Sequence, residues 1–253
     1  LAATNTGSII QSQTTSTGRW MRIYDQDVNV KWFGAKGDGS TDDTASVLSA
    51  YNSITNTGGI LFFPSSSSNY LFNLTITNNN IGIAGRSPSV DGRPNFMPAD
   101  KTQPVLTVGN DSGYTRGFTL QNVGIYGMDK NTNNGAGCIR FGGGAINCEL
   151  NNFSLQGGTN VMWIEGGATY PAYAINSANF EIRAATNSTR GIKVKRHSGS
   201  YTTANTFSQG HLIGSTNGYL CEVDSEKLFF NQVYSDIRTN HGFYLTSAYI
   251  MAD

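Results

Sequence analysis

The chain has little charge and no excess of either sign. Charged residues make up only 13% of its 253 residues, and 17 Lys and Arg balance 17 Asp and Glu. A typical globular domain carries about 25% charged residues. Nucleic-acid binding through phosphate neutralisation depends on a surplus of basic side chains, so we expect no nucleic-acid partner. No apolar run reaches the length that a membrane helix needs, so we expect no membrane span.

Residues that bind metals or carry out redox chemistry are also scarce. Cys138, Cys148 and Cys221 lie far apart and form no CxxC pair, which argues against a zinc site, a redox motif and a disulfide framework. The three histidines lack metal-ligand spacing. Phosphate-loop and G-x-S-x-G motifs are absent as well. We therefore expect no metal ion and no cofactor.

The chain is instead rich in glycine, with 30 residues, and in Asn, Thr and Ser. Glycine, Asn and Ser favour turns and Thr favours strands, so the composition predicts short strands rather than helices. The 38% of hydrophobic residues, with 13 Phe and 12 Tyr, argue against intrinsic disorder.

The first 64 residues predict an arm, a helix and a strand. Residues 1–30 indicate a lead-in arm, because their first part is polar and lacks periodicity. Residues 41–55 are the one good helix candidate, since Thr41 or Asp42 can cap it and apolar residues recur at helical spacing. Residues 60–63 form an apolar stretch that predicts a strand.

Beyond residue 64 apolar residues occur in pairs separated by one residue, and two families of pairs alternate. The first family is Ile81/Ile83, Val123/Ile125, Phe153/Leu155, Phe180/Ile182, Leu212 and Ile237. The second is Leu106/Val108, Ile139/Phe141, Met162/Ile164, Ile192/Val194, Cys221/Val223 and Phe243/Leu245. A spacing of two indicates strands and excludes helical repeats. Stacked units of two strands each predict a β-solenoid, with a β-sandwich as the alternative.

The segment before the repeat carries a specific motif. Residues 28–46 read V-N-V-K-W-F-G-A-K-G-D-G-S-T-D-D-T-A-S, and residues 58–64 read G-G-I-L-F-F-P. Together they resemble the entry motif of the pectate-lyase-like superfamily, especially phage tailspikes and tail-associated polysaccharide depolymerases. The match is specific over residues 28–64, and beyond it only the coil period agrees.

This resemblance implies an all-β fold, a right-handed parallel β-helix with a short N-terminal capping helix. It divides the chain into an arm (1–30), a capping motif with its helix (31–64) and β-helix coils (65–253) that we expect to continue in a longer native chain. It also implies a homotrimer in the virion tail, outside the cell, that acts on bacterial surface polysaccharide. Other phage tail or baseplate proteins would be reached through a missing N-terminal region.

Three aspartates within the motif have two interpretations. Asp38, Asp42 and Asp43 are close enough in sequence to suggest a metal cluster. The simpler interpretation, which we favour, is turn geometry at Asp38 and helix capping at Asp42 and Asp43.

Candidate catalytic residues come from the outward positions of the first family. Neighbouring coils of a β-helix lie about 4.8 Å apart, so equivalent outward residues form rows. This row reads Gly124, Ser154, Glu181, His211 and Asp236. It places its two acids two coils apart, near the separation of about 6.5 to 9.5 Å found in inverting glycosidases, with the histidine between them. The alternative is an exposed row of charges without a catalytic role.

Candidate substrate-binding residues come mainly from the second family. Its outward row reads Thr107, Arg140, Trp163, Lys193, Glu222 and Tyr244. The two aromatic members would stack on sugar rings, and Arg140 and Lys193 would hold acidic sugars. Arg183 and Arg238, each two residues beyond a candidate catalytic acid, are further candidates. Alternatively, Trp163 packs beneath a loop or against a partner subunit.

The leading hypothesis is a phage tailspike segment that binds capsular or O-antigen polysaccharide and depolymerises it, by glycosidic hydrolysis rather than elimination. A non-catalytic polysaccharide-binding or structural trunk of a tail fibre is the first alternative, because acids are sparse. A secreted polysaccharide lyase is the second, although its usual signal peptide and calcium-binding acid cluster are not visible.

Overall fold

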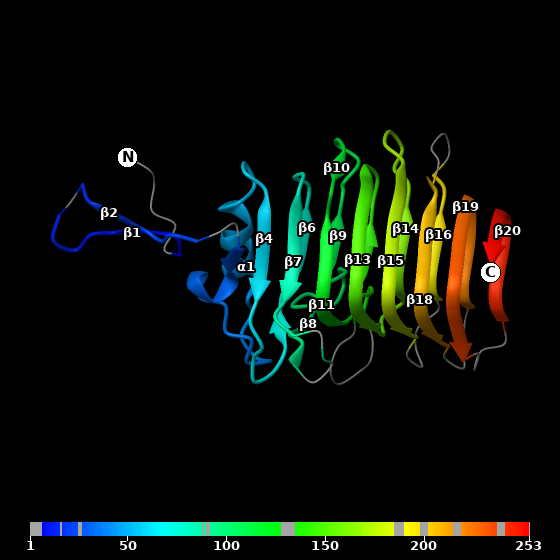
Figure 1. Ribbon diagram of the computed structural model, residues 1–253, viewed down its shortest axis with the longest axis horizontal. Coiled ribbons are helices and arrows are strands. Elements are labelled where there is room, and N and C mark those ends of the chain that lie inside the picture. The colour runs from blue at the N-terminus through cyan, green and yellow to red at the C-terminus, as the bar shows by residue number, and fades with distance from the viewer. Residues whose placement is uncertain are drawn as a thin grey trace.

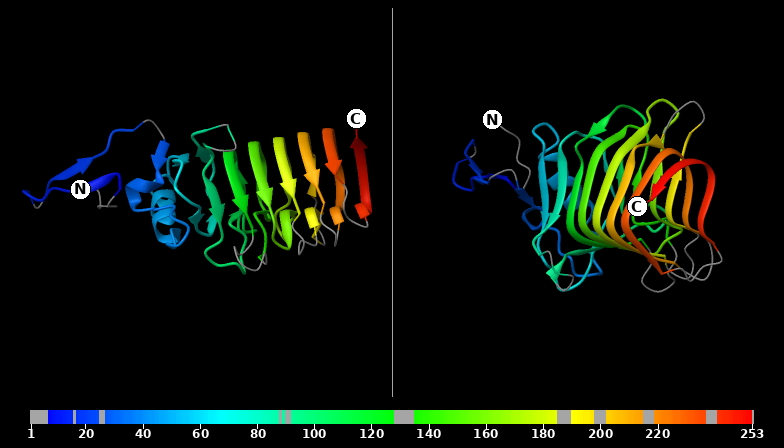
Figure 2. Two further views of the ribbon diagram at one scale, coloured as in Figure 1. Left: turned by 90° about the horizontal axis from the view of Figure 1, so that it is seen from below. Right: turned by 45° about the vertical axis from the view of Figure 1, so that its right-hand side comes forward.

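The computed structural model describes residues 7–15, 17–24, 27–87, 89, 92–127, 135–184, 190–197, 202–214, 219–236 and 241–252. Over this part the chain winds into an elongated stack of coils whose strands pair in parallel from one coil to the next (Figures 1 and 2). The predicted parallel β-helix with a short N-terminal helix is therefore confirmed. No helix in the described part is long and apolar enough to cross a membrane.

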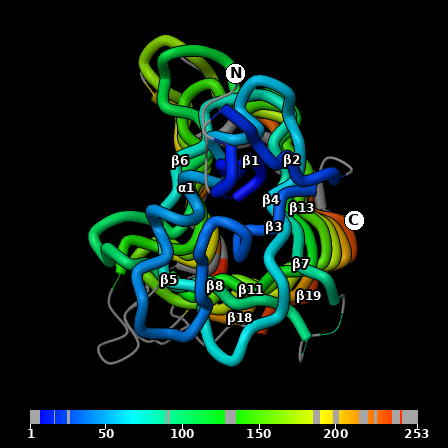
Figure 3. Tube along the Cα trace, turned by 90° about the vertical axis from the view of Figure 1, so that its left-hand side faces the viewer, coloured from blue at the N-terminus to red at the C-terminus, as the bar shows by residue number. Residues whose placement is uncertain are grey.

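Each coil contributes to three parallel sheets, named here faces A, B and C, and Figure 3 shows the stacked coils along their axis. Face A contains β6 (Leu74–Ile76), β9 (Leu106–Val108), β12 (Ile139–Phe141), β14 (Asn160–Glu165), β16 (Arg190–Lys195) and the first parts of β19 (Tyr219–Asp236) and β20 (His241–Ala252).

Faces B and C share long strands that bend from one face into the other. Face B contains β3 (Asp27–Asn29), β4 (Gly59–Phe63), β7 (Ile81–Gly85), the earlier parts of β11 (Thr119–Tyr126), β13 (Ala145–Gln156), β15 (Ala172–Arg183) and β18 (Asn205–Ile213), the middle of β19 and the last part of β20. Face C contains β5 (Tyr70–Leu71), β8 (Asn95–Met97) and the last parts of β11, β13, β15, β18 and β19. The short strands β10 (Thr115–Arg116) and β17 (Thr202–Thr203) pair with the first residues of β13 and β15.

The bend between faces B and C is made by a column of amide residues with positive φ. Its members are Asn122, Asn152, Asn179, Gln209 and Gln232. Asparagine tolerates this left-handed conformation better than most residues, because its short side chain can hydrogen-bond locally. Asn152 Nδ2 donates to Asn122 Oδ1 at 2.7 Å, so neighbouring bends also support one another.

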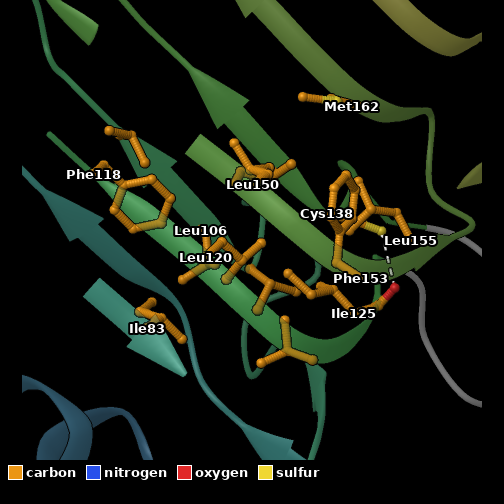
Figure 4. Packing of buried hydrophobic residues seen from close by; sticks show 14 of the residues in the cluster. Ile83, Leu106, Phe118, Leu120, Ile125, Cys138, Leu150, Phe153, Leu155 and Met162 are labelled. Atoms are coloured by element: carbon orange, nitrogen blue, oxygen red, sulfur yellow. Dashed lines mark hydrogen bonds between the residues drawn. The ribbon is translucent and has the colours of Figure 1, made fainter. Parts of the chain in front are cut away.

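The interior is filled by the inward residues of all three faces, and Figure 4 shows part of this packing. Phe153 and Phe180 stack with ring centroids 5.8 Å apart. Each large apolar side chain buried in this way stabilises the fold by about 1.5–3 kcal/mol. Cys138 belongs to the same core, since its Sγ donates to Ile125 O at 3.2 Å and burial raises the pKa of its thiol to about 12.

The N-terminal part begins with an antiparallel hairpin of β1 (Ile9–Gln11) and β2 (Arg19–Met21). After β3 come the 3-10 helix η1 (Val30–Phe33) and α1 (Thr44–Asn52), shorter at both ends than the predicted helix. The helix buries Val47, Ala50 and Tyr51, so it closes the first coil.

The aspartates of the entry motif bind backbone amides. Asp38 accepts hydrogen bonds from Ser40 N and Thr41 N, at 2.9 and 2.7 Å, and these bonds hold the pKa of its carboxyl well below the usual range. Asp43 accepts from Lys36 N at 2.7 Å and makes no side-chain cap of α1. Capping by Asp43 is therefore wrong, whereas Asp42 Oδ1 accepts from Thr44 N at 2.8 Å. Among the described residues, no group of three or more His, Cys, Asp or Glu is arranged to hold a metal ion.

The predicted alignment of the first family is wrong at its two ends. Ile83 pairs with Leu120 on face B rather than with Ile125, because the amide bend separates these two positions of β11. At the other end Leu212 pairs with Ser235, whereas Ile237 lies outside the described residues. The alignment of the second family is confirmed throughout.

Candidate functional site

The outward residues of face C form a row across β11, β13, β15, β18 and β19. Strand pairing joins Gly124 to Ser154, Ser154 to Glu181, Glu181 to His211 and His211 to Tyr234. The last four of these residues line a cleft of about 560 Å³. This volume lies within the range of about 300–1,000 Å³ found for ligand sites.

Asp236 does not belong to this row. It pairs with Ile213, and Ile213 pairs with Arg183. Two coil spacings and two residues along the strand place the backbones of Glu181 and Asp236 about 12 Å apart. The predicted row of Glu181 and Asp236 is therefore wrong, because the coil that ends in β19 is shorter than the one before it and Tyr234 takes the outward position.

Glu181 is the one carboxylate among the described residues that line the cleft. Arg183 Nη2 donates to Glu181 Oε1 at 3.1 Å, and the two side chains are 45% and 44% exposed. An ion pair this exposed contributes only about 0.2–1 kcal/mol. A ligand can therefore displace Arg183 from the carboxylate at small cost.

The segment before β8 contributes Arg93 to the lining of the cleft. Pro94 O accepts from Gly124 N at 3.0 Å, and Asn95 pairs with Gly124. A Cβ at residue 124 would collide with Asn95 Oδ1, so glycine allows this close approach. Arg93 Nη2 donates to Asn152 Oδ1. Burial lowers the pKa of Arg93, and the carboxylate of Glu181 opposes this shift.

Amide side chains from the bend column form another wall of the cleft, namely Asn179, Gln209 and Gln232. Amides both donate and accept hydrogen bonds. Tyr234, which is 74% exposed, adds an aromatic ring with a polar tip. This combination suits a ligand with hydroxyl groups on apolar rings.

The outward row of face A is packed against itself. The ring of Trp163 lies between Arg140 Cζ at 4.8 Å and Lys193 Nζ at 4.6 Å from its centroid. Glu165 forms ion pairs with Arg140 Nη2 at 3.5 Å and with Lys195 Nζ at 3.7 Å. Two faces of the Trp163 ring are thus covered by this protein's own cations.

Glu222, a further member of this row, is also paired. Arg190 pairs with Glu222, which is the next member of the row after Lys193. Burial, followed by the charge of Arg190, lowers the pKa of Lys193. Tyr244 follows in register, and the structure describes its backbone but not its side chain. Arg238, the remaining predicted substrate-binding residue, lies outside the described residues.

The sequence prediction missed Arg93, Tyr234 and the amide wall. The amides had a signal, because an Asn or Gln stands immediately before the face C strand of each coil from β11 to β19. Aligning the coils on these amides instead of on apolar pairs would have put Tyr234 in the row. Arg93 had no such signal, because it lies in a loop that the repeat does not include.

No protein-family model matches the chain, and no curated protein sequence does either. Solved structures do share its fold. The tailspike protein gp49 of Acinetobacter baumannii bacteriophage Fri1, a capsular polysaccharide depolymerase, matches 100% of this chain and 52% of its own length, with a TM-score of 0.65 and 12% identity.

Two further matches lie outside phages. The iota-carrageenase of A. fortis matches 82% of this chain and 50% of its own length, with a TM-score of 0.52 and 17% identity. A putative glycosyl hydrolase from Parabacteroides merdae matches 89% of this chain and 95% of its own length, with a TM-score of 0.51 and 14% identity. At these identities the shared feature is the parallel β-helix fold, and this chain spans about half the length of the tailspike that it matches.

Proposed function

We propose that this chain is part of a phage tailspike that binds bacterial capsular or O-antigen polysaccharide in the face C cleft and cleaves it by hydrolysis. The observation that carries the proposal is the cleft itself, where Glu181, His211 and Arg93 meet a wall of amides. The fold of a tailspike depolymerase, shared along the whole chain, supports it.

In this proposal the substrate displaces Arg183 from Glu181, the carboxyl group of Glu181 then carries the proton and acts as the acid, and His211 is the base. Glu181 donates a proton to the glycosidic oxygen as the bond from that oxygen to the anomeric carbon breaks. His211, on the adjacent coil about 4.8 Å away along the stack, takes a proton from the water that attacks the anomeric carbon. Solvent then returns the proton from His211 to Glu181. Arg93, Arg183 and the amides bind the sugar on either side.

The proposal also places the chain in a homotrimer of the virion tail, outside the cell, with other tail or baseplate proteins as partners. The motif at residues 28–64 and the shared fold support this placement. The proposal assigns the sugar to face C and does not use the predicted sugar-binding residues Trp163, Arg140, Lys193, Tyr244 and Arg238, which no observation tests.

The test is incubation of the full-length protein with a panel of capsular and O-antigen polysaccharides, followed by mass spectrometry of the products. Hydrolysis predicts oligosaccharides that have gained one water per cleavage. A 4,5-unsaturated end would mean elimination and would favour a lyase. If no polysaccharide of the panel is shortened, the cleavage part of the proposal is wrong.

A non-catalytic polysaccharide-binding or structural trunk is the second candidate. The observation that favours it is the single carboxylate of the cleft lining, since glycosidases usually use two. Tight binding without any cleavage, unchanged by Glu181→Gln, would select this candidate.

A further inference from the structure

Two guanidinium groups border the described part of the face C cleft. Arg93 lines it, and Arg183 lies at its edge, bonded to Glu181. Glu181 is the single carboxylate of the described lining and already pairs with Arg183. Arg93 therefore shares the nearby carboxylate of Glu181 with a second cation, Arg183.

Arg93 is also held in place before any ligand arrives. The following Pro94 restricts the backbone of Arg93 to extended conformations. Ser65 Oγ donates to Gly92 O at 2.6 Å, and Gly124 N donates to Pro94 O at 3.0 Å. Both neighbours of Arg93 are thus tied to the coils, and Asn152 Oδ1 orients its guanidinium. A group fixed in this way loses little conformational freedom on binding.

A guanidinium held in a fixed position favours some ligand groups over others. Its planar donors match the two oxygens of a carboxylate, and such bidentate bonds are among the strong ones in proteins. Partial burial has removed water from Arg93, which lowers its pKa. An anion from the ligand would accept hydrogen bonds from Arg93 and also compensate its charge, whereas the hydroxyl groups of a neutral sugar would only accept hydrogen bonds.

We propose that the face C cleft is specific for acidic polysaccharide and that Arg93 binds a sugar carboxylate next to Glu181. This inference rests on the proposed function, because it names the substrate class of the same cleft. It makes Arg93 a specificity-determining residue, separate from the proton transfers assigned to Glu181 and His211.

The test uses an array of purified uronate-containing capsular polysaccharides, each printed beside its carboxyl-reduced form, in which the uronates are neutral hexoses. The wild-type protein should bind at least one acidic form about 10- to 100-fold more tightly than its reduced form, as expected for a charged hydrogen-bonded pair. Arg93→Gln should abolish that ratio by weakening the acidic form alone, and Arg93→Lys should retain part of it.

Arg116→Gln is the matched control, because Arg116 lies on β10 over the ring of Tyr114 and not in the cleft. It should leave the ratio unchanged, and thermal unfolding should show that all three variants fold. Equal wild-type binding of acidic and reduced forms, or a ratio that Arg93→Gln preserves, overturns the inference while the proposed function stands. Binding of neither form contradicts the proposed function itself.

Discussion

Faces A and C carry their outward residues in the same geometry, one residue per coil, but use them differently. On face A the polar groups satisfy one another: Trp163 lies between Arg140 and Lys193, and Glu165 joins Arg140 to Lys195. On face C the row borders a cleft that a loop and a column of amides help to enclose. In this protein the cleft thus lies beside the row that a loop and the amide column flank, and not beside the row whose charges pair with one another.

The difference arises from what stands beside each row. On face A, some acids and bases lie on neighbouring coils, about 4.8 Å apart, so ion pairs such as Lys195 with Glu165 form at 3.7 Å. On face C, Gly124 allows the close approach of Asn95, and the residues just before Asn95 bring Arg93 into the lining of the cleft. The charges of face A thus join neighbouring coils, whereas Glu181 and His211 on face C are accessible to a ligand.

The largest expected effect concerns the acid of the face C row. Glu181→Gln should lower the rate of polysaccharide cleavage about 10²- to 10⁴-fold, because it removes a general acid, and should leave the unfolding temperature nearly unchanged. Product formation measured by reducing-end assay is the readout.

Asp236→Asn is the matched control for this variant. Because Asp236 pairs with Ile213 outside the row, the variant should cleave at nearly the wild-type rate. A loss as large as that of Glu181→Gln would show that the two acids act together, and would contradict the register described here.

The next largest expected effect is a loss of stability from overpacking where face C meets the core. A Cβ at Gly210 would collide with the ring of Phe180, so Gly210→Ala should lower the free energy of unfolding by about 1–3 kcal/mol through overpacking. Urea unfolding measures it. Gly113→Ala is the control, since a Cβ there meets no atom within 4 Å, and it should change stability by less than about 0.5 kcal/mol. Equal effects of the two variants would contradict this account of the packing.

On face A, Trp163→Ala should cost stability and leave polysaccharide binding unchanged. Two cation–π contacts of about 0.5–1 kcal/mol each are lost, so unfolding should become easier by about 1–2 kcal/mol. Isothermal calorimetry with the polysaccharide gives the second readout. A tenfold loss of affinity would instead indicate that face A binds the polysaccharide.

The smallest effect concerns the ion pairs of face A. Glu165→Gln should lower the free energy of unfolding by about 1 kcal/mol, and the difference should shrink in 1 M salt because its partners Arg140 and Lys195 are exposed to solvent, where salt screens their charges. Glu149→Gln, at an exposed position of face B, is the control with no expected change. A salt-independent loss at Glu165 would mean that packing, not charge, is its contribution.

The fold was predictable because the core itself repeats. Pairs such as Phe153 with Leu155 recur where each coil turns its apolar residues inward, and the motif at 28–64 marks the first coil. The prediction failed where that repeat is interrupted: Gly210 and Ser235 stand where the pattern expects apolar residues. The amide at each bend is present in these coils as well. The bend with positive φ therefore marks the register there, whereas the apolar pairs do not.

The candidate site was predictable only in part. Glu181 and His211 follow from the repeat, and the structure places both in the cleft. The contribution of Arg93 depends on a loop outside the repeat, and the self-pairing of Trp163 depends on how long side chains on neighbouring coils fold over one another. Neither property can be predicted from the spacing of residues along the chain.

The most direct test of the account is a crystal structure of Glu181→Gln soaked with an oligosaccharide from a polysaccharide that the protein binds. We expect electron density for the sugar along face C, within hydrogen-bond distance of His211 and Arg93 and beside the ring of Tyr234. Density over Trp163 on face A, with the face C cleft empty, would contradict it.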